Sequence, residues 1–341
     1  MLASIGITIV PHWRPEDSLK YFVAPIPSRT GRKLSDGMNL ETKWLEDFLA
    51  LADLRNFSRA AAQRNVTQPA FGRRIRSLEQ ATGIELIDRV TTPVSLTPQG
   101  RLFRTTARNL LRQMEEGLNQ IHGLDEPGSQ PIDFAASHSL SLSQLPNLLE
   151  HMGKFDVATR SRVESIDMDL AVEALQQGRC VFLLGFDIDA LMQPPFASLP
   201  LGKTWMRPVC ASDSEGTPLF QLEAGQPLPL LRYSPGSHMG RRVNTLLKKS
   251  ADSLQFRSVM ESSLTDLLKV MALRGKGIVW LPDYAITEEL LCGQLQPLGG
   301  DEWCIAVDVV LYRNDVRLHA GAERFWSLLA KQCAAGWLLP M

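Results

Sequence analysis

The sequence predicts an α/β protein with a mainly helical N-terminal part, one long helix and a larger C-terminal part that mixes strands and helices. Short helical patterns fill residues 44–83, and a long helical pattern begins after Thr97. Beyond residue 131, short apolar stretches alternate with helical patterns, which is typical of α/β sheet domains. At 341 residues, the chain is long enough for two or three domains, each with its own core.

The first two helices are indicated by one apolar face and one capping residue. Apolar residues with the spacing of a single helical face are Trp44, Leu45, Phe48, Leu49 and Ala52. Ser58 is a favourable N-cap for a second helix over residues 59–64. The run of Ala60, Ala61 and Ala62 predicts that this helix crosses closely over another, because a bulkier side chain would separate them.

A third helix is expected to follow the turn at Asn65 and Val66. Thr67 is placed to cap it, and Pro69 lies near its start, where a missing N–H group costs nothing. The helix should stop near Gly83. Its predicted buried residues are Phe71, Ile75 and Leu78.

Positive charge is concentrated in this part of the chain. Residues 55–112 contain eleven arginines and three acidic residues, whereas the formal net charge of the whole chain is −1. This excess predicts that the N-terminal part binds a polyanion. The alternative is a solvated helical face whose arginines were selected for helix propensity.

The exposed side of the third helix has the chemistry of a base-reading helix. Its outward residues are predicted to be Gln68, Pro69, Gly72, Arg73 and Arg76. In the major groove, Gln can pair with adenine and Arg with guanine, while neighbouring arginines neutralise phosphates. The candidate DNA-binding residues are Ser58, Arg59, Thr67, Gln68, Pro69, Ala70, Arg73, Arg74, Arg76 and Arg89.

Residues 84–100 predict a two-stranded wing. The β-favouring stretches 84–87 and 94–96 flank a turn that contains Pro93. Arg89 would then be able to reach a DNA backbone or minor groove. Residues 39–97 are therefore expected to form a winged helix-turn-helix, preceded by an irregular extension at 1–37 or by a start codon assigned too far upstream.

Thr97 should cap a long linker helix over residues 98–124. Apolar residues alternate along it in steps of four and three, at Phe103, Ala107, Leu110, Met114, Leu118 and Ile121. So narrow a stripe favours a coiled coil between two copies of the chain. Packing against a later domain of the same chain is the alternative. The stretch 123–131 has the composition of a linker.

The composition also excludes several classes of function. No apolar run is long enough to cross a membrane, and five widely spaced cysteines without metal-binding spacing are typical of a reduced cytoplasmic protein. The motifs G-x-S-x-G, G-x-G-x-x-G, H-E-x-x-H and the P-loop are absent, so no enzyme, cofactor or metal is expected. A nucleoid-type DNA binder without sequence specificity remained a further alternative.

The stretch FSRAAAQRNVTQPAFGRRIRSLEQATGIELIDRVTTPVSLTPQG resembles the winged helix-turn-helix of LysR-type transcriptional regulators along its whole length. One departure is Gly72, where the family usually has serine. The resemblance, over residues 39 to about 330, implies a two-lobed α/β domain like a periplasmic binding protein at 131–341. Lobe 1 would comprise 131–192 and 285–341, and lobe 2 would comprise 193–284. It also implies a homo-oligomer, dimer or tetramer, on a double-stranded DNA operator, with RNA polymerase as a partner if the protein activates transcription.

The C-terminal part is especially similar to the hypochlorite-responsive member of that family, in which sensing is attributed to methionine oxidation. Carried over by motif, Met152 and Met239 occupy matching positions, but Leu264 stands where the relative has a third sensing methionine. The resemblance therefore implies an oxidative stress response through Met152 and Met239. Ordinary core packing by both methionines is the alternative.

A cleft between the lobes offers a competing sensor for a small anionic metabolite. Serines and a histidine lie between strand ends and helix starts, where hydroxyls and free N–H groups can hold an anion. The candidate effector-binding residues are Ser137, His138, Ser139, Ser234, Ser237, Ser262 and Ser263. Each serine taken alone is equally consistent with an ordinary N-cap.

Overall fold

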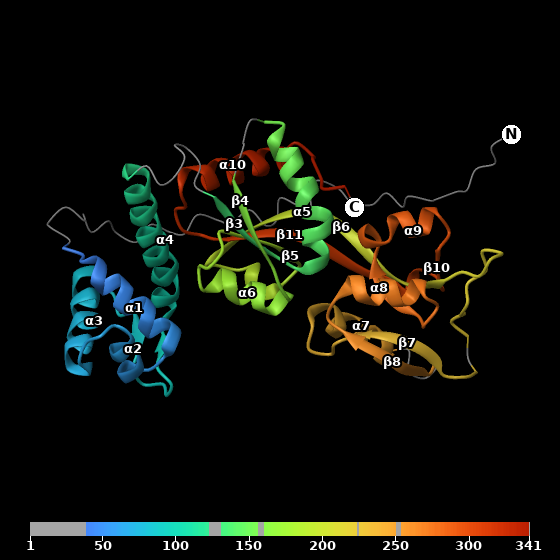
Figure 1. The fold of residues 1–341 in the computed structure, drawn as a ribbon, viewed down its shortest axis with the longest axis horizontal. Helices are drawn as coiled ribbons and strands as arrows, with labels where there is room; N and C mark the ends of the chain where they lie inside the picture. Colours follow the sequence, from blue (N-terminus) through green and yellow to red (C-terminus); the bar gives the residue numbers. More distant parts are fainter. Residues whose placement is uncertain (1–38, 123–130, 156–159, 224, 250–253, 341) are drawn as a thin grey trace. The chain divides into compact units, whose positions relative to one another are not determined.

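The computed structural model describes residues 39–122, 131–155, 160–223, 225–249 and 254–340 (Figure 1). The α-helices are α1 Thr42–Leu54, α2 Phe57–Gln63, α3 Gln68–Thr82, α4 Pro98–Ile121, α5 His138–Gly153, α6 Met168–Gln176, α7 His238–Lys249, α8 Thr265–Leu273, α9 Thr287–Leu291 and α10 Ala320–Ala334. The strands are β1 Ile87–Asp88, β2 Ser95–Leu96, β3 Ile132–Ala136, β4 Ser161–Ser165, β5 Phe182–Phe186, β6 Phe196–Ala211, β7 Leu228–Tyr233, β8 Phe256–Ser262, β9 Val279–Pro282, β10 Leu295–Pro297 and β11 Ile305–Asn314. The expected extension at 1–37 and linker residues 123–130 lie outside the described residues.

Helices α1, α2 and α3 form the predicted three-helix head. Phe71, Ile75 and Leu78 of α3 are fully buried, and α3 ends at Gly83 in the left-handed conformation, as the sequence predicts. The expectation for α2 was wrong at its start. Asn56, not Ser58, is the N-cap, and its side chain accepts a hydrogen bond from the backbone N–H of Arg59. A cap must precede the first helical residue, and Phe57 is already helical.

The alanine run of α2 is buried on one side only. Ala60 and Ala61 are buried in the core formed with α1 and α3, which confirms the predicted close packing for these two residues. Ala62 is exposed, so the expectation was wrong there. Three successive residues on a helix point in three directions about 100° apart, and a single contact face cannot include all of them.

The wing is a short antiparallel ladder in which Ile87 pairs with Leu96 and Asp88 with Ser95. Its strands are shorter than the sequence stretches that predicted them. The ladder leads directly into α4, which Thr97 caps as predicted, because its Oγ1 accepts a hydrogen bond from the Gly100 N–H at 2.9 Å. Gly100 is required at this point, since an added Cβ would lie 2.0 Å from the Leu86 carbonyl oxygen.

Helix α4 divides its contacts between the same chain and solvent. Arg108 donates to the Gln177 carbonyl oxygen at 2.8 Å, and Arg112 pairs with Asp133 of β3 at 2.5 Å. These bonds show that part of α4 packs on the C-terminal domain. The apolar residues of its second half are exposed to solvent: Leu110, Met114, Leu118 and Ile121.

The C-terminal domain is built on a mixed sheet with the strand order β10-β6-β11-β5-β3-β4, and β9 also pairs with β6. Strand β3 runs parallel to β4 and β5, whereas β11 is antiparallel to β5 and β6. Figure 1 shows α6 and α10 on opposite sides of this sheet. The alternation of strands and helices confirms the predicted α/β class.

Strand β6 is longer than the sequence pattern indicated, which reached only from Trp205 to Ala211. Its first part pairs with β11, and its last residues, from Met206 to Ala211, pair with β9 and β10. A single strand thus joins two groups of strands, and β7 and β8 form a separate parallel pair beside the second group. The lobe boundaries expected from the sequence remain a prediction.

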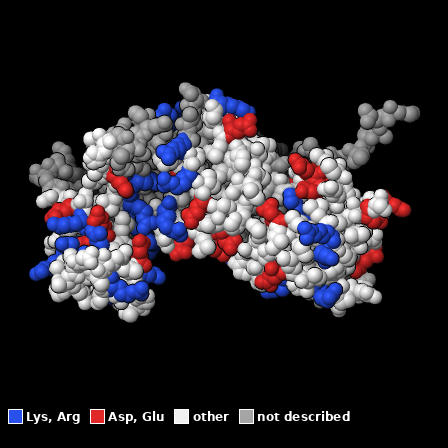
Figure 2. Space-filling view, viewed as in Figure 1, with Lys and Arg blue, Asp and Glu red and all other residues white. Residues whose placement is uncertain are grey.

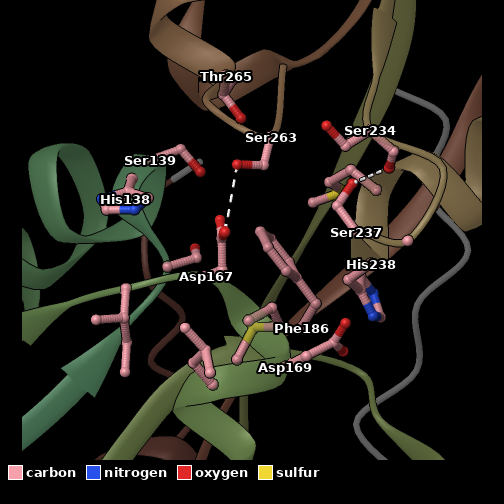
Figure 3. A pocket seen from close by; sticks show the side chains of 16 residues that line it. His138, Ser139, Asp167, Asp169, Phe186, Ser234, Ser237, His238, Ser263 and Thr265 are labelled. Atoms are coloured by element: carbon pink, nitrogen blue, oxygen red, sulfur yellow. Dashed lines mark hydrogen bonds between the residues drawn. The ribbon is translucent and has the colours of Figure 1, made fainter. Parts of the chain in front are cut away.

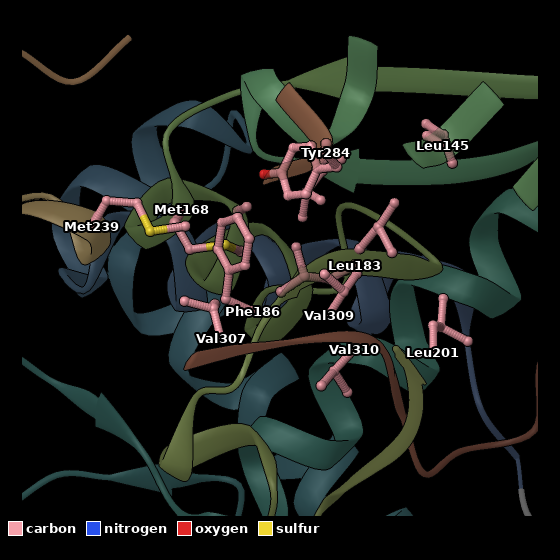
Figure 4. Packing of buried hydrophobic residues seen from close by; sticks show 14 of the residues in the cluster. Leu145, Met168, Leu183, Phe186, Leu201, Met239, Tyr284, Val307, Val309 and Val310 are labelled. Atoms are coloured by element: carbon pink, nitrogen blue, oxygen red, sulfur yellow. The ribbon is translucent and has the colours of Figure 1, made fainter. Parts of the chain in front are cut away.

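One continuous hydrophobic cluster fills the C-terminal domain (Figure 4). Its largest fully buried side chains belong to β3, β5, β7, β9, β11 and α10, and they include Phe134, Phe182 and Trp280. The rings of Phe134, Phe182 and Phe325 contact one another at centroid distances of 5.5–5.7 Å. Phe186, Met168 and Met239 belong to this core and lie at the end of β5 and at the starts of α6 and α7.

Candidate functional site

The exposed face of α3 presents the side chains that the sequence predicted. Thr67, Gln68, Pro69, Arg73 and Arg76 are exposed at the start and along the outer side of the helix, and Ala70 is half-buried. Among the described residues, no carboxylate pairs with Arg73 or Arg76. Their guanidinium groups are therefore available to an external anion or base edge.

Ser58 is exposed on α2 beside the first residue of α3. Its Oγ donates a hydrogen bond to Oε1 of Gln68 at 3.0 Å, which joins the two helices of the helix-turn-helix. The Gln68 carbonyl oxygen is thereby engaged within the protein, and its NH₂ group remains as a donor. Arg59 is exposed on α2. The serine, which the sequence suggested as a cap and a DNA contact, orients the neighbouring glutamine.

Arg74 has a structural partner that the sequence did not reveal. Asp47 of α1 is fully buried, and its carboxylate accepts from Arg74 Nη1 at 3.2 Å and from Arg64 Nε at 2.8 Å. Arg64 also pairs with Glu46. The hydrogen bond from Arg64 to Asp47 raises the pKa of the Arg64 guanidinium. Arg74 thus faces the core of the head, in contrast to its neighbour Arg73.

Arg89 of the wing is also engaged within the protein. Its Nη2 lies 2.6 Å from Oε2 of Glu79, while the other oxygen of Glu79 accepts from the backbone N–H groups of Leu86 and Ile87. Glu79 therefore fastens the wing to α3. The exposed Val90, one residue further, is the apolar tip of the wing.

Basic side chains gather on the surface formed by α1–α4, as Figure 2 shows. Six of the eleven arginines there form ion pairs within the chain: Arg64, Arg74, Arg89, Arg104, Arg108 and Arg112. The positive excess is thus partly neutralised, and five exposed arginines carry what remains: Arg55 after α1, Arg59 on α2, Arg73 and Arg76 on α3, and Arg101 at the start of α4. Three of these five arginines lie on α2 and α3, the two helices of the helix-turn-helix.

A second candidate site is a cavity of about 350 Å³ in the C-terminal domain (Figure 3). Helices α5, α6, α7 and α8 all begin at or next to residues that line it. Because helix N-termini carry partial positive charge and free N–H groups, such an arrangement favours negatively charged or acceptor groups. Its lining residues are Ser137, His138, Ser139, Ile166, Asp167, Met168, Asp169, Leu170, Phe186, Ser234, Gly236, Ser237, His238, Met239, Ser263 and Thr265.

Six of the seven predicted effector residues line this cavity, and Ser262 does not. The Ser262 Oγ instead accepts from the backbone N–H of Leu264 at 3.0 Å, so it shapes the turn before α8. The other side chains have different partners. Ser139 Oγ is 2.9 Å from the hydroxyl of Tyr284, and His138 Nδ1 is 3.0 Å from Ser165 Oγ. The buried Ser137 Oγ has no hydrogen-bond partner among the residues that the structure describes.

Two carboxylates in the cavity were missed by the sequence analysis. Asp167 accepts from Ser263 Oγ at 3.3 Å, a contact that Figure 3 marks. Asp169 receives two hydrogen bonds from Arg241 of α7, at 2.8 and 3.0 Å, and these hold the pKa of Asp169 below its usual value. Because α6 and α7 are far apart in sequence, only the fold reveals this pair.

His238 forms one wall of the cavity and stacks on Phe186, with ring centroids 5.6 Å apart. Burial, followed by repulsion from Arg242, lowers the pKa of His238 to about 4. The imidazole is therefore neutral at physiological pH, and it does not contribute a cation to the cavity. Arg242 pairs instead with Asp187 at the end of β5.

The two methionines proposed from the sequence occupy different surroundings. Met239, the second residue of α7, lines the cavity. Met152 is 1% exposed in the hydrophobic core near the end of α5 and is not a lining residue. Leu264 directly precedes α8, next to Ser263. Met168 of α6 also lines the cavity, although the sequence gave no reason to select it.

No helix among the described residues combines the length and the apolar character needed to cross a membrane. Residues 42–101 match the family described as bacterial regulatory helix-turn-helix protein, lysR family. Residues 126–334 match the LysR substrate binding domain. The two matches together include the head with its wing and the domain that contains the cavity.

Three related proteins match most of the chain. The HTH-type transcriptional regulator YjiE of Escherichia coli K12 is 44% identical over 289 residues, which cover 84% of this chain and 93% of the relative. The crystal structure of Vibrio fischeri DarR in complex with DNA has 42% identity, covers 86% of this chain and 99% of that one, and gives a TM-score of 0.55. The full-length structure of HypT from Salmonella typhimurium, a hypochlorite-specific LysR-type transcriptional regulator, has 43% identity, covers 87% and 99%, and gives a TM-score of 0.57.

Proposed function

The chain belongs to the LysR family of DNA-binding transcriptional regulators, and from this we propose that it binds specific operator DNA through α3 in response to hypochlorite sensed in the cavity. The proposal that the protein binds DNA rests on the exposed first half of α3. Gln68, oriented by Ser58, offers amide donors, and within the described part of the chain Arg73 and Arg76 have no carboxylate partner. Gln and Arg side chains on a recognition helix distinguish adenine and guanine in the major groove.

The remaining exposed groups near the helix start are suited to the DNA backbone. Thr67 is the N-cap residue of α3, where free N–H groups also favour a phosphate, and Arg59 is exposed on α2 next to Ser58. Pro69 and Ala70 offer apolar surface for a thymine methyl group. Arg74 and Arg89, which already bind Asp47 and Glu79, are assigned to holding the head together.

The exposed stripe of α4 supports a homo-oligomer. Leu110, Met114, Leu118 and Ile121 form an apolar row on a helix that is otherwise bonded to the C-terminal domain through arginines. An unpaired apolar seam at this spacing is typical of a helix that pairs with a second copy. Pairing through α4 would place two heads on two half-sites of one operator.

Replacing Leu118 with Glu should weaken this self-association. Burying one leucine contributes about 1.5 to 3 kcal/mol, so the dimer dissociation constant should rise at least about tenfold. Sedimentation of the full chain over a concentration series measures the change. Leu291→Glu makes the same substitution at an exposed residue of α9 and should leave association unchanged. If both variants sediment like the native chain, two copies of the chain do not pair through α4.

The proposed signal is supported by the cavity and by a relative. HypT, which is described as hypochlorite-specific, shares 43% identity with this chain, and Met239 lines the cavity beside Phe186. Oxidation turns a pliable apolar thioether into a polar sulfoxide, which would alter packing at the start of α7. A small anionic metabolite is the alternative signal, and the four helix N-termini and the unpartnered Ser137 hydroxyl favour it.

A reporter assay with methionine variants separates these two signals. The Met239→Leu change should strongly reduce the hypochlorite-dependent change in transcription, whereas Met152→Leu should have a smaller effect because Met152 is buried in the hydrophobic core. Leu preserves side-chain volume, so both variants should fold. If a chain that carries both Met239→Leu and Met152→Leu still responds fully to hypochlorite, the redox proposal is wrong. The cavity is then better explained as a metabolite site.

A further inference from the structure

We infer that Met168 is a second site of oxidation in the cavity and contributes to the response proposed above for Met239. This inference rests on the proposed function for its regulatory part, but the oxidation itself is independent of it. Met168 is the first residue of α6 and lies between Asp167 and Asp169, all three of which line the cavity. Figure 4 draws Met168 and Met239 near the ring of Phe186, and all three residues belong to the hydrophobic cluster.

The position of the Met168 thioether is set by a glycine on β5. A Cβ added at Gly185 would lie 2.7 Å from Cε and 3.1 Å from Sδ of Met168. The absence of a side chain at Gly185 therefore leaves the space in which the thioether rests against the strand. Met168 belongs to the hydrophobic cluster and also lines the cavity, so it lies at the border between core and cavity.

Access distinguishes Met168 from other methionines of the domain. Met168 is 6% exposed and Met239 is 7% exposed, and both border the cavity. Met152 and Met206 are buried in the same hydrophobic cluster, but neither is a lining residue. An oxidant the size of hypochlorous acid that enters the cavity would meet two thioethers there, whereas it reaches the other two only when the domain opens locally.

The reaction needs no group beyond the oxidant and water. The thioether sulfur attacks the chlorine of hypochlorous acid, and hydroxide leaves. Water then adds to sulfur while chloride departs, and the protons of this water are lost, one of them to the hydroxide. The net products are a sulfoxide, chloride and one proton, so sulfur is oxidised and chlorine is reduced.

A sulfoxide at Met168 would change the start of α6. Among the described residues Asp167 makes no side-chain capping bond, so the first N–H groups of α6 lack this acceptor and can bond a sulfoxide oxygen. The neighbouring Asp169 is bonded to Arg241 of α7, the same helix that carries Met239. Oxidation at either methionine would therefore act on the same contact between α6 and α7.

Mapping sulfoxides in the native full-length chain tests the site directly. The protein is treated with less than one equivalent of hypochlorite, quenched with free methionine, digested, and analysed by mass spectrometry. Met114, which is 49% exposed on α4, serves as the solvent-exposed reference, and Met206 serves as the buried reference. Sulfoxide should form at Met168 and Met239 at least about tenfold faster than at Met206, because Met206 requires local unfolding.

Two variants then test the regulatory part. Met168→Leu should remove the sulfoxide signal from the α6 peptide and reduce the hypochlorite response of the reporter, and Met206→Leu, a matched change in the core, should not. Oxidation at Met168 no faster than at Met206, or a full response in Met168→Leu, overturns the inference. A reporter response that depends on Met239 while Met168 stays reduced refutes only this inference. Fast oxidation at Met168 without any reporter response refutes only the proposed hypochlorite function.

Discussion

Replacing Arg64 and Arg74 together with methionine should destabilise the winged head by about 3 to 5 kcal/mol, because the buried carboxylate of Asp47 would lose both of its cations. Asp47 is fully buried, and both arginines bond to its oxygens. A charge left without partners in a protein interior has no water to solvate it. Hydrogen exchange of the slowest amides in α1 and α3 measures this loss without requiring the whole chain to unfold in one step.

Two further variants control this measurement. Arg59→Met combined with Arg76→Met changes the net charge equally, but both residues are exposed, so stability should change by less than about 0.5 kcal/mol. Adding Asp47→Leu to the Arg64 and Arg74 double variant should restore most of the loss, since an apolar replacement of a buried ion pair is often neutral. A double variant as stable as the native head would show that Asp47 is not held by these arginines.

Replacing Arg73 with alanine should relax the choice of DNA sequence at one position by about 1 to 3 kcal/mol, the usual difference for a bidentate contact between Arg and guanine. Arg73 is exposed on α3 and has no carboxylate partner among the described residues, so the substitution removes no internal bond of the head. Competition binding against a panel of operators, each changed at one base pair, identifies the relaxed position.

Arg101→Ala is the matched comparison. Arg101 is exposed at the start of α4 and donates to the Leu96 carbonyl oxygen, beside the wing. If Arg101 contacts phosphate, its removal should weaken binding to every DNA sequence about equally. The number of counterions released on binding, measured from the dependence of affinity on salt concentration, should fall by about one. Uniform losses from both variants would contradict the assignment of α3 as the reading helix.

The sequence predicted best the elements whose signals are local. The apolar run at 132–136 and the helical pattern at 238–249 of the sequence coincide with β3 and α7, and α3 has the predicted buried residues and glycine stop. Each is defined by a short apolar run or by capping residues at its own ends. The cap of α2 was missed because Asn56 and Ser58 are both good caps, and only the observed start at Phe57 decides between them.

What the sequence did not reveal depends on contacts between distant segments. The pair of Asp47 with Arg74 joins α1 and α3, and the pair of Asp169 with Arg241 joins α6 and α7. The first part of β6 lacks a distinctive pattern, and it becomes a strand because β11 pairs with it along its length. The serines at the helix starts could be predicted from the sequence as residues of the cavity. Asp167 and Met168 became candidates only because the fold places them in the cavity wall.

The exposed first half of α3 is proposed to read base edges. Selection of binding sites from a random DNA pool by the full chain, at moderate ionic strength, tests it most directly. A recurring motif with two half-sites is predicted, bound at least about 1,000-fold more tightly than scrambled DNA, and Arg73→Ala should lose one conserved base from each half-site. Equal binding to selected and scrambled sequences, or an unchanged motif in Arg73→Ala, would contradict it.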